Sequence, residues 1–489
     1  MNRFAFTIIL LLLFLPNIFS QRLSEAIKTF AEDEDFQYGS VSVSIVNVED
    51  GKLIAAHQPN LGMTPASSLK VITTAAALHY LGDDFRFKTE IQYDGTIEAD
   101  GTLRGNLFIK GFGDPTLGSH RFKAAENLDE VMGKFLTAIQ AAGIKKIEGY
   151  IIGDASFFTT ETTGRRWLWE DLGNYYGAGA YGLNIQENLY FIDFQQVNTI
   201  GTTPPIKNIR PRIPNLMLVN EVKTDAKGTG DNAYIFGAPL TYTRYVRGTI
   251  PQGNDLFTIK GAIPDPPFFA AHYLAFYLEK NGIATSKRTS YYFDWKRKQR
   301  NTPSKRLTLY TYESPPLKDI VAITNMKSIN LYCEAMLRMI GQVVMGKSTP
   351  NAGLEAIYDF LKKEGMNTKG FFLEDGSGLS PMNSTTTLHL ATAIRIFISN
   401  KTIANSFKAS LPVSAQSGSM QYLLRGTPAA GKVFAKSGGM ERVRSYTGFM
   451  KTKSGNLVSF SMIANDFTCK SSEVRKKMER LMLAIFNET

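Results

Sequence analysis

Ser67 and Lys70 are the first residues whose types and spacing could do chemistry. Two residues three positions apart share a face of a helix. A lysine whose pKa is lowered by burial can take the proton of a neighbouring serine, which makes that serine a nucleophile. At a helix N-terminus, free backbone N–H groups would favour the negative charge that develops during attack. The pair could therefore form a serine nucleophile with a lysine base, but taken alone an N-capping serine beside a solvated lysine is the ordinary interpretation.

Ser68 is the alternative nucleophile, because it also lies close to Lys70 in the chain. It is only two residues away, so a helix would point its side chain elsewhere. We therefore favour Ser67.

Two further short patterns follow in the second half of the chain. Ser328 and Asn330 stand just before a segment with helical periodicity, where a capping residue is the ordinary interpretation. Lys436, Ser437 and Gly438 precede two segments that alternate like strands, where a basic turn is the ordinary interpretation. Taken singly, neither pattern predicts a function.

In this order, Ser-x-x-Lys, Ser-x-Asn and Lys-Ser/Thr-Gly are the signature of serine β-lactamases and penicillin-binding proteins. The long interval between Ser67 and Ser328 resembles the class C low-molecular-mass penicillin-binding proteins, the D-alanyl-D-alanine carboxypeptidase/endopeptidase family. The resemblance covers nearly the whole mature chain. Other segments similar to that family are GFGDPTL at 111–117, GDASFF at 153–158, WEDL at 169–172 and DGSGLS at 375–380.

The resemblance implies an acyl-enzyme mechanism on peptidoglycan stem peptides, without a metal or organic cofactor. Ser67 would attack the carbonyl between two terminal D-alanines, or that of a cross-link, with Lys70 as general base. Ser328 would pass a proton to the leaving amine, and Asn330 would orient the substrate amide. Lys436 would supply positive potential near the substrate carboxylate. β-Lactam antibiotics would acylate the nucleophile because they mimic the acyl donor.

The same resemblance implies substrate-binding roles for Ser437, Gly438 and Gly439. The oxyanion hole would be formed by the backbone N–H groups of the nucleophile and of Gly439. Ser437 and Gly439 stand where the family usually has threonine, and Gly439 removes one expected contact to the substrate carboxylate. Arg442 or Arg444 could replace that contact, and ordinary strand-end charges are the other interpretation.

Asp154 resembles a position in the inserted region that approaches the free amino group of the stem peptide; a turn-forming acid is the alternative. Pro381 stands where the family often has arginine. With Gly439, it leaves open a non-catalytic peptidoglycan-binding or scaffolding protein. A related serine hydrolase, a β-lactamase or an esterase, is the other alternative, and the long insertion argues against a β-lactamase.

The elements that must position these residues follow from periodicity. Residues 40–48 and 52–57 predict a pair of strands, and 64–80 predict the helix that carries the first pattern. Strands near both ends of the chain predict one sheet built from both termini. We expect further helices at 127–142, 268–280, 330–345, 352–364, 386–399 and 472–486, and further strands at 445–451 and 457–463.

The predicted fold class is α/β, and the length of 489 residues suits about three domains. We expect a β-lactamase/transpeptidase-like domain, an antiparallel sheet with helices, formed by residues 21–85 and 265–489. Residues 86–264 contain short alternating segments with frequent glycine and proline. They predict a large, mainly β insertion between the first and second catalytic motifs, of one domain or two nested domains.

Residues 1–20 resemble a secretory signal, with Arg3, an apolar run at 4–15, Pro16 and then Ser20. An uncleaved anchor is the alternative. We expect an exported protein of the periplasm or cell envelope, with no stable membrane span once the signal is removed. The net charge of +11 then favours an anionic envelope polymer as partner over nucleic acid.

Two cysteines are too few for a disulfide scaffold or a four-cysteine zinc site.

Overall fold

The computed structural model describes residues 21–122, 127–298 and 305–489, so the predicted signal at 1–20 lies outside the described residues. The chain divides into two compact units. The first contains the described part of Met1–Asp83, with Val321–Ile329 and Leu354–Thr489. The second contains Asp84–Ile320 and Asn330–Gly353. Among the described helices, none is long and apolar enough to cross a bilayer.

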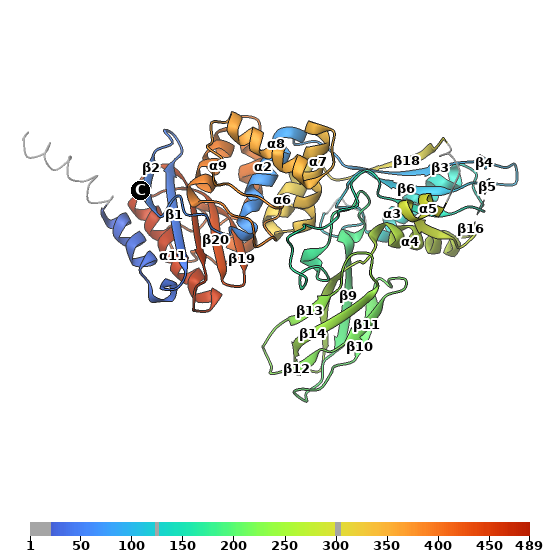
Figure 1. Cartoon of the computed structure of the whole chain (residues 1–489), viewed down its shortest axis with the longest axis horizontal. Coiled ribbons are helices and arrows are strands. Elements are labelled where there is room, and N and C mark those ends of the chain that lie inside the picture. The colour runs from blue at the N-terminus through green and yellow to red at the C-terminus, as the bar shows by residue number, and fades with distance from the viewer. Residues whose placement is uncertain (1–20, 123–126, 299–304) are drawn as a thin grey trace, which may run out of the picture. The chain divides into compact units, whose positions relative to one another are not determined.

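The first unit is built on a five-stranded antiparallel sheet in the order β19-β20-β21-β1-β2 (Figure 1). Its first two strands come from the N-terminal region and the other three from the C-terminal region, which confirms the predicted sheet of both termini. β1 and β21 pair along their full length and join the two chain ends. The strands are β1 (Ser40–Asn47), β2 (Leu53–His57), β19 (Val433–Met440), β20 (Val443–Lys451) and β21 (Leu457–Asn465).

The two faces of this sheet differ in chemistry. One face carries large apolar side chains, among them Phe460 and Met462, and packs with α11 (Ser471–Glu488) in one core. The opposite face carries small hydroxyl residues that are fully buried: Ser42, Ser44, Ser445, Thr447, Ser459 and Ser461. Small side chains let helices approach the strands closely, and α9 (Thr387–Ser399) packs there against β1 and β21.

The helix predicted at 64–80 begins differently from the expectation. Its first turn is a 3₁₀ helix, η2 (Ala66–Leu69), and the α-helix α2 (Lys70–Leu81) follows. The chain enters η2 through Ala66 at a φ of 48°, in the left-handed region. A regular α-helical first turn was therefore the wrong local prediction.

Other helices complete this unit. Residues 21–31 are helical, as is α10 (Ala404–Ser410), which packs on α2 and α9. The two units share α6 (Leu317–Lys327) and α8 (Pro350–Lys363).

The second unit is mainly β, and it extends beyond the insertion predicted at 86–264. Its sheets run β17-β8-β6-β3-β18, β16-β7-β5-β4, β10-β9-β15 and β11-β14-β12, with β13 paired to β14. Its helices include α3 (Leu128–Ala141), α4 (Pro266–Lys280), α5 (Tyr292–Lys298) and α7 (Asn330–Met345). The strands are β3 (Lys88–Tyr93), β4 (Thr96–Ile97), β5 (Thr102–Arg104), β6 (Leu107–Gly111), β7 (Lys146–Ile147), β8 (Ile151–Asp154), β9 (Leu189–Gln195), β10 (Ile206–Arg210), β11 (Met217–Asn220), β12 (Lys223–Asp225), β13 (Asn232–Phe236), β14 (Thr243–Pro251), β15 (Leu256–Ala262), β16 (Ala284–Thr285), β17 (Thr289–Tyr291) and β18 (Leu307–Glu313).

The compact units differ from the predicted boundary at 265. The sequence predicted that the helices from about residue 268 onward belong to the first, transpeptidase-like domain. In the structure, α4 packs on β8 and β17 of the second unit, and the chain re-enters the first unit at Val321. Periodicity identifies an amphipathic or buried helix, but it does not say which sheet the helix covers.

A buried hydroxyl cluster fastens α9 to β1 and provides a test of this packing. The Thr387 hydroxyl lies 2.6 Å from Ser42 Oγ and 2.8 Å from Ser44 Oγ. Replacing Thr387 by the isosteric valine should lower the free energy of unfolding by about 1–3 kcal/mol, because Ser44 loses its partner. Urea unfolding would measure this change.

The double variant Ser44→Ala/Thr387→Val is the control, since it leaves Ser42 with its bond to the Gln58 carbonyl and no orphaned Ser44 hydroxyl. It should be more stable than Thr387→Val alone. A double variant that is less stable than the single one would contradict the account.

Candidate active site

Ser67 and Lys70 are brought together as their spacing predicted. Ser67 lies on η2 and Lys70 is the first residue of α2, with Lys70 Nζ 2.9 Å from Ser67 Oγ. The lysine is fully buried, whereas the serine is partly exposed. The hydroxyl is thus reachable from solvent while the amine beside it is shielded, which is the arrangement that a serine nucleophile with a lysine base needs.

Ser68, the alternative nucleophile, has a structural role. It is fully buried, and its hydroxyl donates to the Pro65 carbonyl at 2.7 Å. The Ser445 hydroxyl oxygen lies 2.6 Å from the Pro65 carbonyl oxygen and 2.9 Å from Ser68 Oγ, within hydrogen-bond distance of both. These bonds fasten η2 to β20 and leave Ser67 as the reachable hydroxyl of the pair.

Lys70 has a second partner that sequence reasoning did not identify. Its Nζ donates to the Ser377 carbonyl at 2.6 Å, and Thr73 Oγ1, one turn further along α2, donates to the neighbouring Gly376 carbonyl at 2.7 Å. The loop with sequence DGSGLS therefore lies against the start of α2. A Cβ added to Gly378 of this loop would come within 2.1 Å of the Ala66 carbonyl oxygen, so the contact is close.

Asp375 holds that loop in its conformation. Its carboxylate is almost fully buried and accepts from the backbone N–H of Gly378 at 2.7 Å and of Ser380 at 2.6 Å. The Asn383 side chain donates to it at 3.0 Å. Asp375 thus positions the carbonyl that receives the Lys70 amine. An Asp followed by Gly-Ser-Gly is a recognisable turn in the sequence, but the turn alone does not reveal its partner.

A second serine–lysine pair joins the second and third predicted motifs. Lys436, on β19, is buried, and its Nζ donates to Ser328 Oγ at 2.9 Å and to the Ser437 carbonyl at 2.8 Å. Ser328 follows the end of α6 and has a φ of 58°. A buried cation beside a partly exposed hydroxyl can supply positive potential and relay a proton.

β19 passes directly over the turn that carries Ser67. A Cβ at Gly438 would lie 2.5 Å from the Pro65 carbonyl oxygen and 2.8 Å from the Ser68 backbone nitrogen. The strand approaches η2 this closely because it has no side chain at that position. The two serine–lysine pairs are therefore held against each other within one compact unit.

β19 is an edge strand whose outer backbone groups are open near Gly439. The Ala435 N–H points away from β20, since it donates to the Pro412 carbonyl. Backbone groups alternate in direction along a strand, and the pairing with β20 runs without a register shift. The N–H groups of Ser437 and Gly439 therefore point to the same open side, where an oxyanion could accept from Gly439.

Of the two arginines considered for the missing threonine contact, Arg444 lies beside Gly439. Its Nη1 is 3.2 Å from the position of a Cβ at Gly439, and its Nη2 donates to Ser471 Oγ at 2.8 Å. Arg442 is exposed at the turn between β19 and β20. Arg444 is thus the cation next to the open edge.

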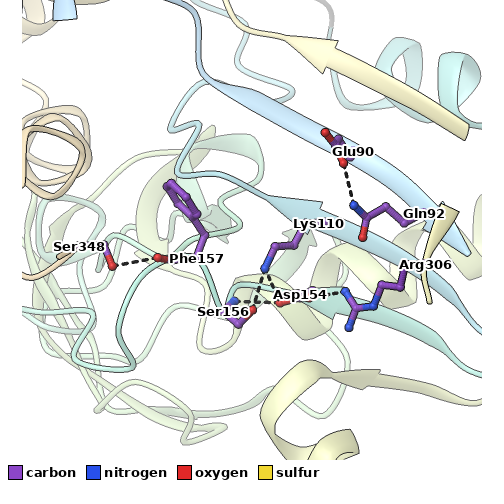
Figure 2. Close-up of polar contacts among 8 residues, drawn as sticks. All are labelled: Glu90, Gln92, Lys110, Asp154, Ser156, Phe157, Arg306 and Ser348. Carbon is purple, nitrogen blue, oxygen red and sulfur yellow. Dashed lines mark hydrogen bonds and ion pairs between the residues drawn. The ribbon is translucent and has the colours of Figure 1, made fainter. Parts of the chain in front are cut away.

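Asn330 and Asp154 belong to the second unit. Asn330 begins α7, is largely buried, and donates from Nδ2 to the Tyr176 carbonyl at 2.8 Å. The Asp154 carboxylate is 1% exposed and lies between Lys110 Nζ, at 3.2 Å, and Arg306 Nη1, at 2.6 Å (Figure 2).

Burial alone would raise the pKa of Asp154, but the Lys110 charge and the Arg306 hydrogen bond outweigh it and hold the pKa below its ordinary value. In this structure the carboxylate of Asp154 is matched by cations of its own chain. Its substrate-binding role stays a prediction.

In the ranges that the structure describes, no three His, Cys, Asp or Glu side chains gather to hold a metal ion. Cys333 and Cys469 do not form a disulfide with each other.

Known proteins resemble this chain along nearly its whole length. The sequence model of the D-Ala-D-Ala carboxypeptidase 3 (S13) family matches residues 23–486. A D-alanyl-D-alanine carboxypeptidase of Actinomadura sp. strain R39 is 28% identical over 91% of this chain and 81% of its own. Penicillin binding protein 4 (dacB) from Haemophilus influenzae has a similar fold, with a TM-score of 0.78 at 22% identity, covering 95% of this chain and 99% of that one. The same protein complexed with a novel β-lactam gives a TM-score of 0.75 at 21% identity over the same shares.

Two adjacent glycines provide a matched test of the close approach of β19. Gly438→Ala should lower the rate of acylation by a fluorescent penicillin by about 100-fold, because its Cβ collides with backbone atoms of the Ser67 turn and displaces them. Gly439→Ala should change the rate little, since its Cβ comes closest to the end of the flexible Arg444 side chain, at 3.2 Å, and meets backbone only at the ordinary contact distance of 3.8 Å. Stopped-flow fluorescence would compare the variants, and equal rates would contradict the proposed contact.

Asp375→Asn tests the positioning of Lys70. The variant replaces one carboxylate oxygen by an amide nitrogen, which cannot accept from the Ser380 N–H. The loop should then change its conformation, and the Ser377 carbonyl should move away from the Lys70 amine. We expect the acylation rate constant to fall about 10–100-fold, with the dissociation constant of the preceding non-covalent complex unchanged.

Asp50→Asn is the matched control for Asp375→Asn, because Asp50 accepts from the Lys52 N–H in an exposed turn of the same unit. It should acylate like the wild type. Weaker non-covalent binding by Asp375→Asn, with a normal acylation rate constant, would contradict a positioning role.

Proposed function

The chain belongs to the D-Ala-D-Ala carboxypeptidase 3 (S13) family, and on that premise we propose that it cleaves peptidoglycan stem peptides through an acyl-enzyme on Ser67. It is a D-alanyl-D-alanine carboxypeptidase of the serine type, since its family is one of serine peptidases. The bond cleaved is the one between two terminal D-alanines, or the equivalent bond of a cross-link between stems. The observation that carries this mechanism is the fully buried Lys70 amine, 2.9 Å from the partly exposed Ser67 hydroxyl.

Acylation proceeds by proton transfer and attack. Lys70 takes the Ser67 proton as Oγ attacks the substrate carbonyl, and the tetrahedral oxyanion accepts from the N–H groups of Ser67 and Gly439. Ser328 gives its proton to the leaving amine and receives the one that Lys70 took from Ser67, so that Lys70 is again a neutral base. The Lys436 ammonium, 2.9 Å from Ser328 Oγ, stabilises the negative charge that develops on that oxygen during the transfer. D-Alanine, or the donor stem, departs.

Hydrolysis returns the enzyme to its starting state. Water attacks the ester carbonyl, and Lys70 accepts the water proton and returns one to Ser67 Oγ. The products are the shortened peptide and the free serine. The carbonyl of Ser377 keeps the Lys70 amine in place in both half-reactions, because its 2.6 Å bond uses an N–H of the amine and leaves the lone pair free to take the proton.

Substrate binding uses the open edge of β19. A stem peptide in extended conformation can add to this edge, since the N–H groups of Ser437 and Gly439 point outward there. The substrate carboxylate lies towards Lys436, Ser437 and Arg444, with Arg444 replacing the threonine absent at Gly439. Asn330 orients the substrate amide.

Asp154 is the least supported of the proposed binding residues. It would receive the free amino group of a stem peptide, but Lys110 and Arg306 already neutralise its carboxylate. A substrate amine would have to displace one of these cations. The ion pairs favour the structural interpretation of this acid.

The paired geometry favours catalysis over a scaffolding role. Ser67 is partly exposed, whereas Ser68 is buried, and the buried lysine lies beside Ser67. A protein that only binds peptidoglycan has no need for this arrangement. A buried cation is costly, so its retention beside a nucleophile has a chemical reason. We therefore place a peptidase ahead of a non-catalytic binding protein, and ahead of a β-lactamase or esterase.

We also propose that the protein is exported and works in the periplasm or cell envelope. Residues 1–20 would direct export, and the net charge of +11 suits an anionic envelope polymer. Peptidoglycan stem peptides are the substrate, and β-lactam antibiotics are covalent inhibitors.

Intact-protein mass spectrometry tests the acyl-enzyme. Wild-type chain incubated with a fluorescent penicillin should gain the mass of one penicillin, and it should release D-alanine from a stem peptide that ends in D-Ala-D-Ala. Ser67→Ala should do neither, because the attacking oxygen is gone; the loss of turnover should exceed about 10³-fold.

Ser68→Ala is the matched control, since it removes the neighbouring hydroxyl and keeps Ser67. It should still be acylated. Acylation of Ser67→Ala, or its loss only in Ser68→Ala, would show that the nucleophile is misassigned. If wild-type chain is acylated but then destroys the penicillin rapidly, the β-lactamase alternative holds.

A further inference from the structure

A cavity in the second unit uses none of the residues assigned to catalysis. It has a volume of about 150 Å³ and lies between the end of β8, the start of α4 and the segment that leads into α5. Gly153 and Ala155 line it, whereas Asp154 between them joins Lys110 and Arg306. Side chains alternate along a strand, so the cavity opens on the side of β8 opposite to the Asp154 cluster.

The cavity is aromatic, with a single buried acid in its wall. Tyr181, Tyr291, Tyr292 and Phe293 contribute rings, and Asp265 is the one carboxyl group among the lining residues that the structure describes. The remaining lining residues are glycine, alanine, threonine, leucine and proline. An apolar pocket with one convergent charged group is the usual form of a small-molecule site.

Asp265 is only half used by its own chain. It caps α4, with Oδ1 accepting from the Phe268 N–H at 2.9 Å. The donor recorded for Oδ2 is the Tyr242 hydroxyl at 3.5 Å, longer than an ordinary O–H···O bond. Burial, helped by Asp294, raises the pKa of Asp265 to about 6, so the group is largely ionised above neutral pH. The side chain is 4% exposed, and its second oxygen can accept from a ligand.

The charges around the cavity favour a ligand with a positive charge. Asp294 on α5 adds negative potential at Asp265, and Arg297 is engaged with Asp294 at 2.7 Å. An anion would be repelled by the two acids. A cation would gain a charge-assisted hydrogen bond from Asp265 and attraction from the electron-rich ring faces.

The size limits the ligand further. A protein cavity of roughly 150 Å³ holds a molecule about as large as benzene. That volume admits an ammonium group on a short alkyl chain, and it excludes a whole peptide or sugar chain. We propose that this cavity binds a small organic ammonium ion, with its nitrogen on Asp265 and its alkyl chain among the rings of Tyr181, Tyr292 and Phe293.

Direct binding tests the proposal independently of the peptidase activity. The full chain would be titrated calorimetrically with n-butylammonium, n-butanol and butyrate, which share an alkyl chain and differ in charge. Butylammonium should bind saturably, butanol at least about tenfold more weakly, and butyrate not at all. Penicillin acylation measured on the same sample reports the active site separately, so failure of one proposal leaves the other standing.

Asp265→Asn removes the charge and keeps the cap, because the asparagine oxygen can still accept from the Phe268 N–H. Its affinity for butylammonium should fall at least about tenfold. Asp231→Asn is the control, since Asp231 caps a turn at the Ala233 N–H in the same unit and does not line the cavity. Thermal melts would establish that both variants fold.

Removing one ring tests the aromatic wall. Phe293→Ala should weaken butylammonium binding several-fold, whereas Tyr422→Ala, which removes an exposed ring from the first unit, should leave it unchanged.

The pH dependence has a defined sign. Butylammonium stays protonated from pH 5 to 7.5, whereas Asp265 ionises over that range, so affinity should rise with pH. The groups around Asp265 are Asp294, Tyr242 and Tyr181, together with the buried Arg244, whose charge acts on both tyrosines. The tyrosines do not titrate over this range because their pKa values are raised, and the arginine stays charged. The rise should be absent in Asp265→Asn.

Three results would overturn the proposal. They are the absence of saturable butylammonium binding to the wild-type chain, equal binding of butanol and butylammonium, and unchanged affinity in a folded Asp265→Asn variant. If that variant does not fold, the comparison of the three ligands on the wild-type chain still decides.

Discussion

The candidate active site depends on one buried amine. Lys70 is fully enclosed, and its Nζ is shared between the Ser67 hydroxyl and the Ser377 carbonyl. A buried lysine is expensive unless its donors are satisfied, so the surroundings of this side chain are tightly constrained. The turn that Asp375 organises is part of that environment, as is the 3₁₀ start of the helix. Each places an acceptor where the amine needs one.

The sheet chemistry explains how such an environment can be built. Large apolar residues on one face make a conventional core with α11. Serines and threonines on the other face leave room for η2 and α9 to lie close to the strands, and their hydroxyls bond to one another or to backbone carbonyls. Gly438, which has no side chain, likewise lets the edge strand lie close to η2. The nucleophile is thus positioned by small residues and polar contacts as well as by packed hydrocarbon.

Much of this could be predicted from the sequence, for identifiable reasons. The spacing of Ser67 and Lys70 survives the change from α-helix to 3₁₀ turn, because both geometries bring residues three apart together. Strand alternation at both chain ends predicted the shared sheet. The role of Asp375 could not be predicted, since it depends on a contact with a residue about 300 positions away. The packing of α4 could not be predicted either, because the sequence pattern of a buried helix does not show which sheet the helix packs against.

The sheet that joins the N-terminal and C-terminal strands also determines when the active site can form during synthesis and folding. Ser67 and Lys70 are synthesised early, but the strand with Lys436 and the loop that holds the amine are made late. Pairing of β1 with β21 joins residues more than 400 positions apart, and non-local pairing of this kind slows folding. The emerging chain therefore carries its nucleophile in an inert form until the later strands have been made. Activity begins only when the final strands have docked.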